Sequence, residues 1–282
     1  MSKYIATIAK TNEIMSRFSI FTKKKYGQNF IIEPKIVENI ARLAIKDPNT
    51  LTLEIGPGIG ALTEQLAILS KQVIAFEIDN SLIEVLDYSL QDYNNVEIVN
   101  IDFLKLDFNE FMKDKTGYNQ VVLAANLPYY ITTPILFKVF ESNVKLDLIS
   151  VMVQKEVADR FSAKINTKDY NALSVIVQYL YDVKVVMNVP KTVFNPKPNV
   201  ESSVVQFSKK EKEILVNNEN DFFELVKACF KQRRKTLYNN LRDYYKDSNY
   251  VIELLEKTNY KQNRRAQELS LEDFIKIYEA TL

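Results

Sequence analysis

Short apolar runs alternate with helix-periodic segments over the first 160 residues, and this alternation constrains the fold more than any other feature of the chain. Strands that alternate with helices predict right-handed βαβ units and a mostly parallel sheet. The sequence therefore predicts an α/β domain. We expect strands at 51–55, 73–77, 96–101, 121–125 and 146–153, and helices at 33–46, 61–69, 80–90, 133–140 and 154–161.

The pattern changes after about residue 170. Segments 175–181, 183–189 and 203–207 are rich in β-branched residues and are expected to be strands. From about residue 208 the chain is charged and helix-periodic, which predicts a smaller all-helical C-terminal domain. We expect three parts: an N-terminal extension at 1–22 (a mobile arm or a short helix), an α/β domain at 23–208, and a helical domain at 209–282.

The chain contains no histidine, which excludes Ser-His-Asp chemistry and His-ligated metals. Its one cysteine, Cys229, excludes an internal disulfide and a cysteine-based zinc site, and we expect it to be a small core residue. An enzyme of this composition must use carboxylates, amides, tyrosines, lysines or a cofactor. We expect no metal.

The net charge of +1 argues against a uniformly basic protein but leaves room for local basic patches. Lys23-Lys24-Lys25 is one such patch. A second, near residue 230, has helical spacing, which predicts that its members share one helical face. The second patch consists of Lys227, Lys231, Arg234 and Lys235.

No apolar stretch approaches the roughly 20 residues of a membrane helix, and residues 1–25 lack the apolar core of a secretory signal, so we expect a cytoplasmic protein with no membrane partner.

Three of the five glycines, Gly56, Gly58 and Gly60, lie between a predicted strand and a predicted helix. Glycines in this position allow a ligand to approach the backbone closely. Glu77 lies at the end of the next strand, where an acidic residue commonly binds both hydroxyls of a ribose. A dinucleotide site predicts a similar arrangement but prefers the spacing G-x-G-x-x-G.

Two further carboxylates favour S-adenosylmethionine over a dinucleotide. Glu54 precedes the glycine loop and can hold an ammonium group, and Asp102 at the third strand end can accept from an adenine amine. S-adenosylmethionine contains an ammonium group, a ribose and an adenine, but no pyrophosphate. An ordinary strand–turn–helix without a ligand remains an alternative.

The tetrapeptide Asn126-Leu127-Pro128-Tyr129 follows the apolar run at 121–125. Ligands of open α/β sheets bind at the carboxyl ends of strands, where these residues are expected. The Asn126 amide oxygen can accept from an amine, Pro128 disfavours helical backbone at Leu127, and Tyr129 offers a flat face for stacking. Together they suit a planar base with an exocyclic amine. A strand-end turn with a stacked tyrosine is the alternative.

These motifs together resemble the rRNA adenine dimethyltransferase family, and in particular its bacterial small-subunit group. The resemblance extends from about residue 23 to the C-terminus and implies a Rossmann-like class I methyltransferase domain that uses S-adenosylmethionine. The segments that show it are Gly27–Ile31, Glu54–Gly60, Asn126–Tyr129, Gln154–Ala158, Phe194–Val200 and Phe230–Leu237, with Glu77 and Asp102.

The resemblance also implies roles for individual residues. Asn29 and Ile31 would lie against the cofactor, with Gly56 at its amino-acid end, and Asn126 would lie between cofactor and substrate. Phe194 would stack on the target base opposite Tyr129. The remaining residues expected at the cofactor are Glu54, Gly58, Glu77 and Asp102, and those expected at RNA are Lys231, Arg233, Arg234 and Lys235.

The implied activity is dimethylation of two adjacent adenosines in a hairpin loop near the 3′ end of small-subunit (16S) rRNA. The expected partner is this RNA within a pre-30S particle, and the protein is expected to be monomeric. The alternatives are an erythromycin-resistance methyltransferase acting on large-subunit rRNA, a non-catalytic RNA-binding assembly factor with the same fold, and a nucleotide-dependent oxidoreductase.

Overall fold

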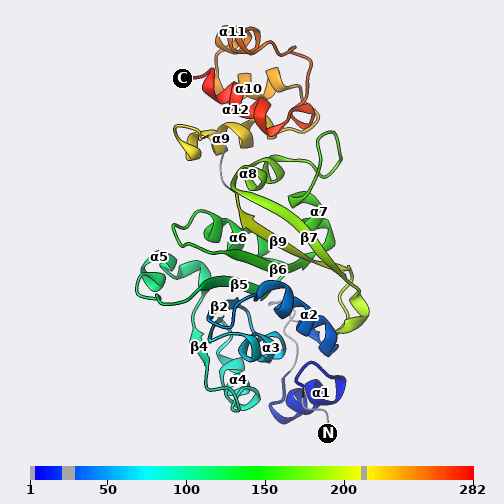
Figure 1. Cartoon of the computed structure of the whole chain (residues 1–282). Helices are drawn as coiled ribbons and strands as arrows, with labels where there is room; N and C mark the ends of the chain where they lie inside the picture. The colour runs from blue at the N-terminus through cyan, green and yellow to red at the C-terminus, as the bar shows by residue number, and fades with distance from the viewer. Residues whose placement is uncertain (1–3, 21–28, 211–214) are drawn as a thin grey trace. The chain divides into compact units, whose positions relative to one another are not determined.

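The computed structural model describes residues 4–20, 29–210 and 215–282, and it divides the chain into two compact units (Figure 1). Unit 1 comprises Met1–Ala158 and Lys184–Lys209, and unit 2 comprises Asp159–Val183 and Lys210–Leu282. The segment 159–183, which the sequence placed in the α/β domain, thus groups with the C-terminal helices. The basic run Lys23-Lys24-Lys25 and the residues Gly27 and Gln28 lie outside the described residues.

A seven-stranded sheet in the order β4-β3-β2-β5-β6-β9-β7 forms the centre of unit 1 (Figure 1). The first five strands in this order pair in parallel, whereas β9 pairs antiparallel with β6. This arrangement confirms the predicted α/β fold. The strands are β2 (Thr50–Ile55), β3 (Gln72–Glu77), β4 (Val96–Asn100), β5 (Gln120–Asn126), β6 (Leu148–Gln154), β7 (Tyr181–Val189) and β9 (Ser202–Lys209).

Successive side chains of the central strands point to opposite faces of the sheet, and both faces are buried. On one face, Val122 and Met152 belong to the same core cluster as helices α2 and α3. On the other face, Phe76 packs against the Phe103 ring at a centroid distance of 5.3 Å, and Phe207 packs against Phe140 of α6 at 5.3 Å. The helices of this unit are α2 (Pro34–Ala44), α3 (Ala61–Leu69), α4 (Ile83–Ser89), α5 (Phe108–Met112) and α6 (Thr132–Phe140), with 3-10 turns η2 (Asn80–Leu82), η3 (Phe103–Lys105) and η4 (Lys191–Val193).

The N-terminal residues that the structure describes include a helix, α1 (Ile8–Arg17). A short helix was one of the two possibilities expected for this segment. The buried Glu64 carboxylate of α3 accepts from the Ile5 backbone N–H at 3.0 Å, and Ile14 is fully buried in the core of unit 1. The Arg17 guanidinium lies over the Tyr88 ring of α4 at 4.2 Å. Helix α1 is thus an integral part of unit 1.

The segment 175–181 was predicted to be a strand, and this prediction is wrong: residues Ala172–Leu180 form α8. A short apolar run such as Val175–Val177 fits a buried helix as well as a strand. The decisive signal was local. Asn171 caps the helix by accepting from the Leu173 N–H at 2.9 Å, and Ser174 accepts from the Asn171 N–H, which forms a capping box.

Helices make up the C-terminal part of unit 2, as predicted. An aromatic cluster forms its core, in which the Phe222 ring contacts Tyr179 at 5.2 Å and Tyr278 at 5.7 Å. Cys229 is fully buried, and burial raises its pKa to about 12, so it is a core residue as expected. The helices are α9 (Glu219–Cys229), α10 (Leu237–Tyr245), α11 (Ser248–Thr258) and α12 (Leu271–Glu279), with η5 (Ala266–Glu268); α7 (Lys155–Phe161) follows β6. None of the helices within the described ranges is long and apolar enough to cross a membrane.

Candidate active site

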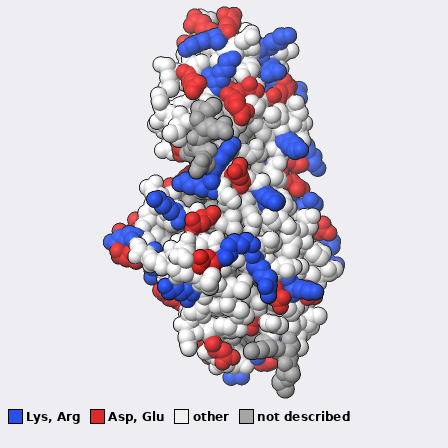
Figure 2. Space-filling model, viewed as in Figure 1, with Lys and Arg blue, Asp and Glu red and all other residues white. Residues whose placement is uncertain are grey.

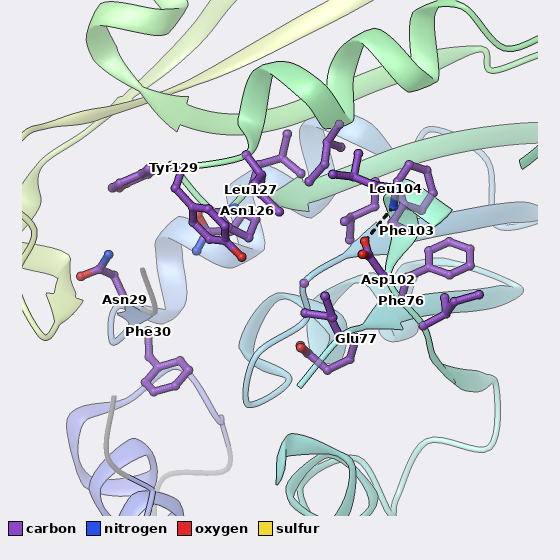
Figure 3. A pocket seen from close by; sticks show the side chains of 18 residues that line it. Asn29, Phe30, Phe76, Glu77, Asp102, Phe103, Leu104, Asn126, Leu127 and Tyr129 are labelled. Atoms are coloured by element: carbon purple, nitrogen blue, oxygen red, sulfur yellow. Dashed lines mark hydrogen bonds between the residues drawn. The ribbon is translucent and has the colours of Figure 1, made fainter. Parts of the chain in front are cut away.

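A pocket opens at the carboxyl ends of β2, β3 and β5 in unit 1, where ligands of such sheets bind (Figure 3). The empty space between its lining residues, including the part open to solvent, is about 830 Å³. Asn126 and Tyr129 lie on one side of this space, Asp102 and Glu77 on another, and Asn29 on a third (Figure 3). The predicted residues that line it are Asn29, Gly56, Glu77, Asp102, Asn126, Leu127, Pro128 and Tyr129.

The glycine loop adopts backbone conformations that only glycine tolerates well. Gly56, Gly58 and Gly60 have φ of +73°, +63° and +91°. The Gly56 N–H donates to the Phe76 carbonyl at 2.9 Å, which ties the loop to β3. A Cβ on Gly58 would lie 3.3 Å from the Phe30 ring, so the backbone also needs the space that glycine leaves.

The Glu77 carboxylate is held in place by two backbone donors. Its Oε1 accepts from the Asp79 N–H at 2.8 Å, and its Oε2 accepts from the Gly58 N–H at 3.4 Å. The residue is buried, and this burial raises its pKa. A carboxylate fixed at the end of β3 and facing the pocket can accept from the two hydroxyls of a ribose, because it has acceptor sites to spare.

Glu54 lies one residue before the end of β2 and does not line the pocket. Its side chain is 1% exposed, and among the described residues no donor reaches its Oε2 atom. Burial raises the pKa of Glu54 to about 8; the nearby Thr63 hydroxyl opposes this shift and the charge of Glu77 adds to it. A buried carboxyl without a partner is costly, so a cation placed beside it would be stabilised.

Asp102 lies two residues after the end of β4 and is the N-cap of η3. Its Oδ1 accepts from the Leu104 N–H at 3.0 Å, which fixes the carboxylate at the pocket wall (Figure 3). The Lys138 ammonium donates to the Leu104 carbonyl at 2.9 Å and so ties η3 to α6. The second oxygen, Oδ2, has the exposed Lys105 at 4.0 Å as its one ion-pair partner in the described ranges, and it can accept from a ligand amine.

The tetrapeptide Asn126–Tyr129 leaves β5 as an ordered turn. The Leu127 N–H donates to the Met152 carbonyl at 3.1 Å. The Pro128 carbonyl accepts from the Ile131 N–H at 3.2 Å and from the Thr132 hydroxyl at 3.0 Å, so both of its acceptor positions are used. In the part of the chain that is described, no donor approaches the Asn126 amide or the Leu127 carbonyl. These two oxygens are therefore available for a ligand amine.

Besides Glu54, three predicted residues do not line the pocket. Gly58 lies in the loop but does not line the cavity. Ile31 in β1 (Phe30–Ile31) pairs with Phe194 in β8 (Phe194–Asn195). Both side chains are 3% exposed and belong to the core cluster. Stacking of Phe194 on a base would require its ring to leave this core, so the role expected for it does not fit the structure.

Apolar side chains that the sequence did not single out form much of the pocket wall. Phe103 follows Asp102 directly, and Phe30 follows Asn29, so each adjoins a predicted residue in the sequence. Their apolar character gave no sign that they face a cavity instead of the core. Within the described ranges, no group of three or more His, Cys, Asp or Glu side chains could hold a metal. The other apolar lining residues are Ile55, Phe76, Ile78, Ile101, Leu104, Tyr130, Ile131 and Ile135.

The second predicted basic patch is not on one helical face, and this prediction is wrong. Helix α9 ends at Cys229, so Lys231, Arg234 and Lys235 lie in the connection to α10. The buried Asn240 amide stabilises this connection by donating to the Cys229 carbonyl at 2.8 Å and to the Gln232 carbonyl at 3.2 Å, and by accepting from the Gln232 N–H at 3.1 Å. These bonds replace the helical ones that the periodicity had suggested.

Three basic segments that are far apart in the sequence meet in unit 2. Arg233 donates to the Thr167 carbonyl at 3.2 Å and to Gln267 Oε1 at 3.3 Å, and the Leu237 N–H donates to the Arg264 carbonyl at 2.7 Å. Charges of both signs are interspersed over the visible face of the molecule (Figure 2). We call the three segments that these bonds join, 164–168, 231–237 and 261–267, the basic surface; its cations are Lys164, Lys168, Lys231, Arg233, Arg234, Lys235, Lys261, Arg264 and Arg265, of which Lys235 pairs with Asp243 at 3.1 Å.

The fold and the pocket together define a Rossmann-like methyltransferase. A family model described as "Ribosomal RNA adenine dimethylase" matches residues 21–281, and the chain belongs to this family. A relative from Oceanobacillus iheyensis, "Ribosomal RNA small subunit methyltransferase A", is 44% identical over 281 residues, covering 98% of this chain and 96% of the relative. The resemblance inferred from the motifs is thus confirmed. Because this alignment includes most of residues 1–22, the similarity extends further than the motifs indicated.

Two solved structures are similar over most of the chain. A dimethyladenosine transferase from Plasmodium falciparum is 29% identical with a TM-score of 0.72, covering 88% of this chain and 95% of that one. The 23S rRNA methyltransferase ErmE is 25% identical with a TM-score of 0.66, covering 89% of this chain and 99% of that one. The fold is therefore shared by a protein named as a dimethyladenosine transferase and by one named as a 23S rRNA methyltransferase.

Proposed function

We propose that this chain transfers methyl groups from S-adenosylmethionine to the exocyclic amines of two adjacent adenosines in a hairpin loop near the 3′ end of small-subunit (16S) rRNA. The observation that supports this best is the pair of unpartnered acceptors, the Asn126 amide and the Leu127 carbonyl, at the edge of a pocket lined by Glu77 and Asp102. The similarity to relatives named for the small subunit favours that RNA as the substrate.

The pocket residues fit S-adenosylmethionine as the methyl donor, which supplies an electrophilic methyl group on a sulfonium. Glu77 would accept from the ribose hydroxyls, and Asp102 Oδ2 from the adenine amine, between apolar walls that include Phe103 and Ile78. Gly56 and the loop that it begins would lie along the amino-acid end. The Glu54 Oε2 atom behind this loop, which no described donor reaches, would accept from the ammonium group, and the cation placed there would favour the ionised form of the carboxyl.

The two free acceptors explain how a poor nucleophile can react. The lone pair of the adenine amine is delocalised into the ring. If the Asn126 amide oxygen and the Leu127 carbonyl each accept one of its hydrogens, the nitrogen is drawn toward a tetrahedral geometry and its lone pair points at the methyl group. Catalysis is then mainly positioning. No strong base is needed because the product ammonium is acidic, which is consistent with a site lacking histidine.

The target base must leave its stack, which costs a few kcal/mol and less in a loop than in a duplex. A face of the Tyr129 ring beside Asn126 would offset part of this cost, since aromatic stacking contributes about 1–3 kcal/mol per base. The basic surface of unit 2 would contact RNA phosphates. We further propose that the protein acts as a monomer on a pre-30S particle in the cytoplasm.

Methyl transfer to isolated subunits tests the proposal. Purified protein is incubated with labelled S-adenosylmethionine and with unmethylated small or large ribosomal subunits. We expect label in the small-subunit RNA alone. Label in the large-subunit RNA alone would instead indicate an enzyme of the erythromycin-resistance type, and binding of small subunits without any transfer would indicate an assembly factor.

A further inference from the structure

The hydroxyl of Tyr129 forms a short hydrogen bond with a residue that the motifs did not include. Its oxygen lies 2.6 Å from Ser202 Oγ. Ser202 is the first residue of β9, is fully buried, and faces Gln154 of β6 in the antiparallel register. Tyr129 lines the pocket next to Asn126, whereas Ser202 does not line it (Figure 3). The bond therefore connects the pocket wall to a rigid strand of the sheet.

This hydrogen bond restricts the rotation of the Tyr129 side chain, which the backbone of the turn does not fix. The turn before it is fixed by the hydrogen bonds of the Leu127 N–H and the Pro128 carbonyl. The ring can still rotate about its side-chain torsions unless its far end is held. A half-buried hydroxyl without a partner would also be costly, so the ring has one strongly favoured position. Burial raises the pKa of Tyr129, which keeps its hydroxyl protonated at neutral pH.

We propose that Ser202 is a positioning residue for methyl transfer, which holds the Tyr129 ring where it stacks on the target adenine. This inference rests on the proposed function, because it assumes that Tyr129 faces the base. Ser202 touches neither the base nor the cofactor and acts only through Tyr129. Loss of its hydroxyl lets the ring move, and small misplacements of a reacting base slow transfer strongly.

The neighbouring Ser203 provides a matched control. It is 1% exposed, lies in the same strand, and forms one hydrogen bond with the Asn188 amide oxygen at 2.9 Å. Because successive residues of a strand point to opposite faces, its side chain is directed away from Tyr129. Ser203→Ala removes a buried hydroxyl and its hydrogen bond, as Ser202→Ala does, but it leaves the pocket wall intact.

The test compares Ser202→Ala, Tyr129→Phe, the double variant, Ser202→Thr and Ser203→Ala in methyl transfer to unmethylated small subunits. We expect Ser202→Ala and Tyr129→Phe each to lower kcat/KM about tenfold, the double variant to lose no more than either single one, and Ser202→Thr to recover part of the rate. Cofactor affinity, measured by calorimetry, should stay within twofold. Ser203→Ala should keep its rate even where its melting temperature falls as far as that of Ser202→Ala.

Three results would overturn the inference while leaving the proposed function in place. They are a normal rate for Ser202→Ala beside an impaired Tyr129→Phe, losses that multiply in the double variant, and an equal loss in Ser203→Ala. A different result would remove the stacking role of Tyr129 from the proposed function: normal transfer by both Tyr129→Phe and Tyr129→Ala. The role of Ser202 would then be lost with it.

Discussion

At the scale of single residues, the chemistry depends on oxygens that the fold leaves without donors. The carbonyls of Leu127 and Pro128 both follow Asn126 in the chain. The hydrogen bonds to Pro128 from Ile131 and Thr132 leave Leu127 as the second acceptor. The two proposed acceptors of the target amine are thus one side chain, Asn126, and one backbone carbonyl, that of Leu127.

Asn126→Ala removes the side-chain acceptor and leaves the Leu127 carbonyl. We expect turnover to fall by about a hundredfold or more, because polarisation and orientation of the amine are both lost. Cofactor affinity should change less than turnover, since Glu77 and Asp102 are untouched. Single-turnover transfer and calorimetry measure the two quantities. Turnover near the wild-type rate would exclude Asn126 from the mechanism.

Glu54 should make stability depend on pH. Its pKa is raised from 4.5 to about 8 in the folded protein, so between these values the folded state keeps a proton that the unfolded state has lost. Unfolding then releases a proton, and the contribution of Glu54 to stability falls as pH rises through this window. The stability of Glu54→Gln relative to the wild type should therefore rise by up to about 4 kcal/mol in unfolding free energy from pH 5 to pH 9.

Denaturant unfolding at several pH values measures this gain. The thiol of Cys229 does not affect the comparison, because it is present in both proteins and its contribution cancels in their difference. A difference between Glu54→Gln and wild type that stays constant from pH 5 to pH 9 would show that Glu54 titrates normally and is not buried as described.

At the scale of secondary-structure elements, prediction succeeded where one signal dominated. The parallel strands follow from continuous apolar runs, and the pocket residues Glu77, Asp102 and Asn126 follow from their places at strand ends. Helix α8 was missed because its apolar run fits either structure. The end of α9 was missed because no glycine or proline marks it, and the side chain that stabilises it, Asn240, lies in the next helix.

Contacts between distant segments could not be predicted from the sequence for a different reason. Ser202 and Tyr129 are 73 residues apart, and their hydrogen bond depends on how β9 pairs with β6. The burial of Phe194 likewise depends on its pairing with β1. Such pairings are set by the packing of the whole sheet, and no local pattern in the sequence specifies them.

The connection between α9 and α10 gives an element-scale prediction. Asn240→Ala removes three hydrogen bonds and leaves the buried carbonyl of Cys229 and the part-buried N–H and carbonyl of Gln232 without this partner. We expect a loss of about 1–3 kcal/mol in unfolding free energy. Asn239→Ala, which removes an amide hydrogen-bonded to Thr236 at 2.9 Å, should cost less because Asn239 is only half-buried. Equal losses in the two variants would contradict the account of this connection.

At the scale of the whole molecule, the account assigns chemistry to unit 1 and RNA docking to unit 2. Lys231 and Arg234 test this division because both are exposed and neither side chain has a hydrogen bond or ion pair among the described residues. Changing both to Ala should leave the melting temperature and cofactor affinity unchanged. Affinity for small subunits should fall, and its salt slope should shrink by up to about two phosphate contacts.

Lys235→Ala is the control for this pair, since its ion pair with Asp243 gives it a structural role. Titrations at several salt concentrations, beside melting curves, separate docking from stability. An unchanged salt slope in the Lys231→Ala, Arg234→Ala double variant would mean that the basic surface does not meet phosphates.

The most direct test of the central claim is to map the methylated bases after reaction of the wild-type protein with unmethylated small subunits. Mass spectrometry of nuclease fragments gives the position and the number of added methyl groups. The account predicts two adjacent dimethyladenosines in a hairpin loop near the 3′ end of the small-subunit RNA, and no other modified base. Methyl groups on another base type, on isolated single adenosines elsewhere, or on no base at all would contradict it.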